Sequence, residues 1–195
     1  FIFLTFGSVD IEWNLSYKLF KLKEKINTNN FINEIIVTFD KILKKFIKIN
    51  NEYNIKNKYN NKKVFIIIVI PFEPLPLSND YMLKFSKKNN TEFYNILSYK
   101  ERVNLWNIYA NKLKNMIKLN YKEIKVIDLR NYFKDDGYKN YLSTVEDHHP
   151  DINKTKDIFI KELDNLEFNN NEVYLKLQAK PYNGLSMYQH IRRPL

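Results

Sequence analysis

Residues 64–70 (VFIIIVI) constrain the fold of this chain more than any other segment. The run is apolar throughout and almost entirely β-branched, so it offers no polar face to solvent. Such a run is typical of a central strand in a parallel sheet that is covered by helices on both faces. It ends at Pro71, which cannot continue the hydrogen bonding of a sheet. We therefore expect a buried parallel strand here, in a chain whose 195 residues suit one α/β domain.

Apolar periodicity elsewhere predicts the elements that surround this strand. Short apolar runs predict further strands at residues 2–6 and 124–129, with a short one at residues 173–177. The predicted helices cover residues 13–26, 31–49, 98–117 and 154–166, and Ser98 with Glu101 predicts a capping box at the start of the third. Polar residues predict a surface connection at 50–63, and a long loop, a candidate functional loop, follows at 71–97. Because helices alternate with strands, we expect the strands to be parallel.

The ends of the predicted strands carry the chemistry-bearing residues. In α/β folds, ligands bind where the carboxyl ends of parallel strands meet. Three features follow such ends here: residues 7–10 (GSVD), the loop after Pro71, and residues 145–150 (VEDHHP). We expect all three to face one site.

Composition excludes several classes of function. The chain has no cysteine, so it forms no disulfide scaffold and no thiolate metal site, and no apolar run has the length of a membrane helix. The formal net charge is +10, but lysine supplies all but four of the 32 basic residues and is spread over the whole chain. This pattern favours a solvated surface over a nucleic-acid interface. The absence of cysteine and of a recognisable signal peptide slightly favours the cytoplasm.

Two of the three histidines, His148 and His149, are adjacent and follow the carboxylates of Glu146 and Asp147. A neutral imidazole can take a proton from a hydroxyl near pH 7, and a neighbouring carboxylate can orient it. The cluster therefore predicts a general base and its orienting acid. A solvated acidic turn is the alternative; a metal site is disfavoured, because adjacent ligands do not easily face one ion. The third histidine, His190, is interpreted as a surface residue.

The turn at residues 7–10 is the second candidate site. Gly7 permits a positive φ, which lets a substrate approach the backbone, whose N–H groups can donate to an oxyanion. Ser8 and Asp10 lie in the same turn. The alternative is an ordinary turn at the end of a strand.

These motifs resemble the SGNH/GDSL-type hydrolase family. Residues 7–10 resemble its Gly-x-Asn-Asp turn, and residues 146–150 (EDHHP) resemble its Asp-x-x-His segment, with His149 in the catalytic place. The resemblance covers residues 2–165 and implies a flavodoxin-like three-layer fold that cleaves esters by Ser–His–acid acyl transfer, without metal or cofactor. It implies that His149 is the base, and that Glu146 or Asp147 orients it. It also implies a small-molecule or glycan ester as substrate, often an acetyl ester on carbohydrate.

The sequence departs from the family pattern at three points. Glu146 stands in place of the expected aspartate, unless Asp147 takes that part. Val9 stands in place of the oxyanion asparagine, and no Gly-Asp-Ser nucleophile motif occurs. We therefore expect residues 1–166 to be the carboxy-terminal part of such a domain, incomplete at its amino end, followed by an extension at 167–195. One alternative is that Ser8 is itself the nucleophile. Another is that the chain is a catalytically inactive α/β interaction module. A sheet of three parallel strands leaves an open edge, which predicts aggregation or a partner.

Overall fold

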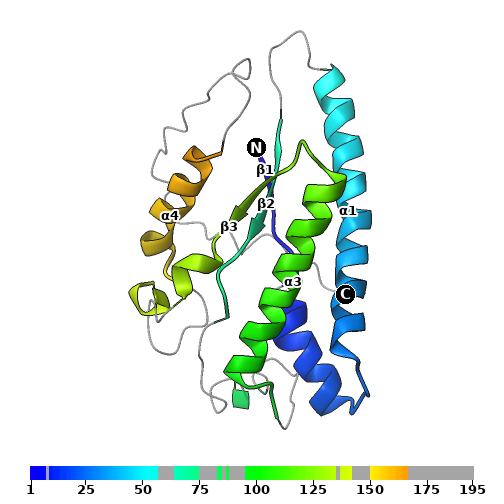
Figure 1. Ribbon diagram of the computed structural model, residues 1–195, viewed down its shortest axis with the longest axis vertical. Coiled ribbons are helices and arrows are strands. Elements are labelled where there is room, and N and C mark those ends of the chain that lie inside the picture. The colour runs from blue at the N-terminus through cyan, green and yellow to red at the C-terminus, as the bar shows by residue number, and fades with distance from the viewer. Residues whose placement is uncertain are drawn as a thin grey trace.

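The computed structural model describes residues 1–7, 9–56, 64–74, 83–84, 87, 95–134, 137–141 and 150–166. Within these residues the chain forms a mixed α/β fold around a three-stranded parallel sheet, with strand order β1-β2-β3 (Figure 1). The strands are β1 (Ile2–Leu4), β2 (Ile66–Ile70) and β3 (Lys125–Asp128). The prediction of a central, buried parallel strand that stops before Pro71 is confirmed.

Helices lie against both faces of the sheet. Helices α1 (Thr28–Lys56) and α3 (Tyr99–Asn120) pack on one face, where Ile66, Ile68 and Ile70 of β2 join the larger core cluster. Helix α4 (Ile152–Asp164) packs on the opposite face, where Ile67 belongs to a second cluster. Figure 1 shows α1 and α3 on the right of the sheet and α4 on its left. Alternate residues of β2 thus enter two separate apolar layers, which explains why the strand has no polar side chain.

Helix α3 begins as the sequence predicts. The Ser98 hydroxyl accepts a hydrogen bond from the Glu101 backbone N–H at 3.3 Å, and the Glu101 carboxylate accepts one from the Ser98 N–H at 2.8 Å. This reciprocal pair is a capping box, and it satisfies backbone donors that have no partner within the helix.

Helix α1 is longer than predicted. Its first turn is capped by Asn27, whose side-chain oxygen accepts from the Asn30 N–H at 3.1 Å. At the other end, the helix continues to Lys56, so the predicted connection at residues 50–63 is wrong for its helical part. The amides of Asn50 and Asn54 each donate to the Val64 carbonyl at 3.0 Å. These bonds hold the last turns of α1 to the chain that enters β2.

The helical segment after β1 also differs from the prediction. It consists of two wide π-helical turns, η1 (Asp10–Asn14) and η2 (Tyr17–Lys21), instead of a regular helix over residues 13–26. The segment begins early because the Ile11 N–H donates to the Gly7 carbonyl at 3.0 Å. It stops before Lys23, which has a φ of +58°. Leu15 is nevertheless fully buried in the larger core, together with Ile11, which precedes the predicted helix, whereas Leu22 is 49% exposed. The apolar pattern therefore identified the buried face in part.

Several predicted features lie outside the described residues, among them most of the loop at 71–97, the short strand at 173–177 and the extension at 167–195. In the part of the chain that is described, no helix combines the length and the apolar character needed to cross a bilayer.

Candidate functional site at the carboxyl edge of the sheet

The ends of the three strands bring the candidate residues to one edge. Because the strands are parallel, the turn after β1, the proline-rich segment after β2 and the turn after β3 all leave the sheet at its carboxyl edge. Gly7 follows β1, Glu73 follows β2, and Arg130 follows β3. The edge is therefore where any site on this fold is expected.

Gly7 is required by the geometry of its turn. It is buried and has a φ of +87°, a conformation that residues with a Cβ rarely adopt. A Cβ placed on Gly7 would lie 2.5 Å from Cζ of Tyr109. The Tyr109 hydroxyl donates to the carbonyl of Phe6 at 2.8 Å, so α3 holds the turn directly. Gly7 thus adopts the positive φ that a glycine at this position permits.

Asp10 lies three residues after Gly7, and its carboxylate accepts a hydrogen bond from the Asn14 amide at 2.7 Å. It lines a shallow depression of about 210 Å³ together with Phe6, Phe31, Glu34, Ile35 and Thr38. Ser8 lies outside the described residues. The Asp10 carboxylate thus bonds a side chain of its own helical segment, at the surface of the edge that carries Gly7.

A charged pair that the sequence analysis missed ends β3. The Arg130 guanidinium donates to both carboxylate oxygens of Asp128, from Nε at 2.9 Å and from Nη2 at 2.8 Å. Lys114 adds a third bond to the same carboxylate at 2.9 Å. Burial alone would raise the pKa of Asp128, but the hydrogen bonds and charges of Arg130 and Lys114 outweigh it and lower the pKa to about 2.

Arg130 also connects the end of β3 to the end of β2. Its Nη1 donates to the side-chain oxygen of Asn107 at 2.7 Å, and its Nη2 donates to that of Asn111 at 3.1 Å. The Asn107 amide in turn donates to Oε1 of Glu73 at 2.7 Å. Glu73 is buried, with 8% of its surface exposed. The sequence contained one weak signal for this network: Asn107 and Asn111 are one helical turn apart, on a helix that packs against the sheet.

A second buried charge pair supports the turn after β1. Arg102 of α3 is completely buried, and its Nη1 lies 3.7 Å from Oε2 of Glu12 in η1. Burial raises the pKa of the Glu12 carboxyl to about 7, although the Arg102 charge acts in the opposite direction. This pair was also missed, because the two residues are 90 positions apart in the sequence.

The four residues of the histidine cluster, Glu146, Asp147, His148 and His149, lie outside the described residues. The described residues on either side of this segment do meet: the Asp151 N–H donates to the Tyr141 carbonyl at 2.6 Å. The Tyr141 ring stacks on Phe133 at 5.8 Å, and Phe133 stacks on Phe72 at 4.3 Å. Because Phe72 is the second residue after β2, both flanks of the histidine segment are fixed at the carboxyl edge.

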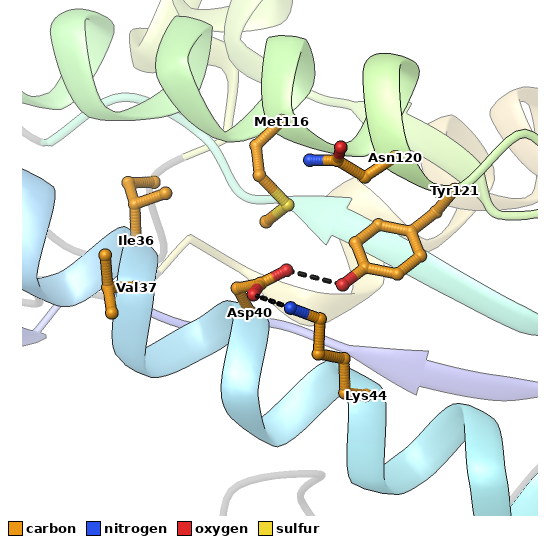
Figure 2. A pocket seen from close by; sticks show the side chains of 7 residues that line it. All are labelled: Ile36, Val37, Asp40, Lys44, Met116, Asn120 and Tyr121. Carbon is orange, nitrogen blue, oxygen red and sulfur yellow. Dashed lines mark hydrogen bonds and ion pairs between the residues drawn. The ribbon is translucent and has the colours of Figure 1, made fainter.

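A second depression, larger than the one beside Asp10, lies elsewhere on the described surface. It measures about 350 Å³ and is lined by residues of α1 and of the carboxyl end of α3: Ile36, Val37, Asp40, Lys44, Met116, Asn120 and Tyr121 (Figure 2). Figure 2 shows the Asp40 carboxylate between Lys44, at 2.6 Å, and the Tyr121 hydroxyl, which donates to it. Burial acts to raise the pKa of Asp40, but these two partners lower it. Since Tyr121 precedes β3, this depression belongs to the amino edge.

The described residues, which include none of the histidines, contain no group of three or more metal-ligating side chains. Comparison of the chain with protein-family models, with curated proteins and with solved structures found no match. The site therefore has to be interpreted from its own geometry.

Proposed function

We propose that this chain forms part of an ester hydrolase of the SGNH type, with its site at the carboxyl edge of a flavodoxin-like sheet. One observation carries the proposal: the hydrogen bond between Tyr141 and Asp151, together with the stack of Tyr141, Phe133 and Phe72, fixes both flanks of the histidine segment at that edge. The buried, positive-φ Gly7 follows β1 at the same edge. The described flanks of the segment that carries the proposed base and the turn that carries the proposed oxyanion donor thus both follow strands at this edge, which supports the proposal.

In this proposal, His149 takes the proton from a serine hydroxyl as the serine oxygen attacks the ester carbonyl. Glu146 or Asp147 orients the imidazole, and His148 is the residue that precedes the base in the sequence. Backbone N–H groups at Gly7 stabilise the oxyanion. The imidazolium then protonates the departing alcohol, and water, activated by the same base, releases the acid. The nucleophile is a serine elsewhere in the complete protein; Ser8, which follows Gly7 in the sequence, is the alternative.

A fluorophosphonate probe, which reacts with activated serines, tests the proposal on the full-length protein. We expect labelling of one serine, which peptide mapping identifies, and hydrolysis of 4-nitrophenyl acetate. Both should be lost in His149→Ala and retained in His190→Ala, the matched control. Equal activity of the two variants would show that the assignment of His149 is wrong, and mapping to Ser8 would identify the nucleophile within this chain.

A second candidate function is an interaction module without catalytic activity. Phe3 of β1 and the preceding Phe1 are 40% and 42% exposed. Among the described strands, β1 pairs with β2 on one side, so its other side is an edge of the sheet. An apolar open edge favours association. Light scattering after gel filtration tests this candidate: a concentration-dependent mass that Phe3→Lys reduces would support it.

A further inference from the structure

Glu73 is a buried carboxylate at the carboxyl edge that the mechanism above does not use. It lies three residues beyond β2, between Phe72 and Pro74, and 8% of its surface is exposed. Burying a carboxylate is unfavourable unless hydrogen-bond donors or positive charge compensate for the lost water. The presence of this group at the ligand-binding edge of the fold therefore requires a physical reason.

The side chain of Glu73 is held in place by a chain of hydrogen bonds. Asn107 donates to Oε1 of Glu73 at 2.7 Å and accepts from Arg130 at 2.7 Å, which fixes the orientation of the Asn107 amide. Asn107 also donates to the Val103 carbonyl at 3.1 Å. An amide with its oxygen and nitrogen assigned in this way can only donate to Glu73. The carboxylate is thus positioned as an acceptor before any ligand arrives.

The positive charge of Arg130 is directed to a different carboxylate. Two of its nitrogens bond Asp128 at 2.8 and 2.9 Å, so the bidentate ion pair of this network is made with Asp128. Within the described residues, the hydrogen bond from Asn107 is the one that Glu73 receives. A carboxylate has about four acceptor positions, so Glu73 retains capacity for further donors.

We propose that Glu73 is a specificity-determining residue whose carboxylate accepts a hydrogen bond from a free hydroxyl group of the ester substrate. The inference rests on the proposed function, and it defines the substrate class as hydroxylated esters. A hydroxyl donor fits better than an ammonium group, because the chain has a formal net charge of +10, which disfavours the approach of cations. A site built to bind a hydroxyl strongly rejects an analogue that lacks it.

Two esters of the same carbon skeleton test this role: glycerol 1-acetate, which carries two free hydroxyls, and propyl acetate, which carries none. The full-length protein should prefer glycerol 1-acetate in kcat/KM. Glu73→Gln keeps the oxygen that Asn107 bonds but removes the charge. It should raise KM for glycerol 1-acetate about tenfold, the loss expected for one hydrogen bond to a charged group. Turnover of propyl acetate should not change, nor should either substrate respond to Glu123→Gln, an exposed control.

Equal loss on both esters would overturn the inference, because it would give Glu73 a structural role only. An NMR titration separates this result from failure of the proposed function. The side-chain amide of Asn107 should shift on addition of glycerol 1-acetate in the wild type and not in Glu73→Gln. A shift without turnover would support Glu73 and contradict hydrolysis. Turnover with the same shift in both proteins, or no shift in the wild type, would contradict the role of Glu73.

Discussion

The hydroxyl of Tyr109 donates to the carbonyl of Phe6 at 2.8 Å, and the ring of the same tyrosine occupies the space that a side chain on Gly7 would need. Tyr109 of α3 thus holds the end of β1 in two ways: it makes a hydrogen bond to Phe6, and its ring fills the space beside Gly7. The conformation of the turn that leads from the sheet into η1 therefore depends on contacts with α3 as well as on the φ of +87° at Gly7.

Gly7→Ala should lower the free energy of unfolding by about 3 kcal/mol. Roughly 1 to 2 kcal/mol comes from a Cβ in the left-handed region, and the remainder from overpacking against Tyr109. Urea denaturation measures the change. In a Tyr109→Ala background the overpacking is absent, so the same substitution should cost only the roughly 1 to 2 kcal/mol of the left-handed conformation. An equal cost in both backgrounds would show that the ring does not exclude the side chain.

Local signals in the sequence predicted the elements that depend on local physics. The β-branched run at 64–70 with Pro71, and the Ser98–Glu101 pair, were sufficient to place β2 and the start of α3. The extension of α1 through residues 50–56 was not predicted, because polar side chains there suggested a solvated connection. The side chains of Asn50 and Asn54 bond the backbone of Val64, which is ten or more positions away in the sequence.

Asn54→Ala should destabilise the protein by about 2 kcal/mol, because it removes two hydrogen bonds to a partly buried backbone. The Asn54 amide donates to the Val64 carbonyl at 3.0 Å, and its oxygen accepts from the Val64 N–H at 2.8 Å. Thermal unfolding followed by circular dichroism measures the loss. Asn51→Ala, an exposed change in the same turn of α1, is the control and should have little effect. Equal effects of the two substitutions would mean that the hydrogen bonds between Asn54 and Val64 do not contribute measurably to stability.

The network at the carboxyl edge could not be predicted from sequence. Glu73, Asn107 and Arg130 come from three elements, and each is an ordinary polar residue in its own segment. Only the parallel sheet, by ending β2 and β3 side by side under α3, brings them together. The histidine cluster was noticeable because its residues are adjacent in sequence, and its role stays a prediction.

The pair of Asp128 and Arg130 should make stability depend on acidic pH. The pKa of Asp128 is lowered to about 2 in the folded protein, so the ionised form stabilises the fold above the usual carboxyl pKa near 4. This contribution, about 2 kcal/mol, is lost as pH falls from about 4 to 2. Urea unfolding of the wild type and Asp128→Asn at several pH values measures it.

The difference between those two proteins should be largest above pH 5 and should close near pH 2. Asp164→Asn, an exposed substitution at the end of α4, is the matched control and should show no such trend. A constant difference across this range would contradict the assignment of the ion pair to folding stability.

Glu12 should produce the opposite dependence at higher pH. Burial raises its pKa to about 7 in the folded protein, so the folded state holds a proton that the unfolded state releases near pH 4.5. Stability from this group is therefore complete below about pH 4.5 and is lost as pH rises towards 7 and above. Because the side chain is 22% exposed, the loss should be about 2 kcal/mol, less than the full shift implies. Glu12→Gln, which resembles the protonated acid, should remove this decline in stability. Glu52→Gln, an exposed substitution in α1, is the control and should not remove it.

If Glu12→Gln is instead less stable than the wild type at pH 8, the ionised pair of Glu12 with Arg102 stabilises the fold, and the protonated form of Glu12 is not the favoured one.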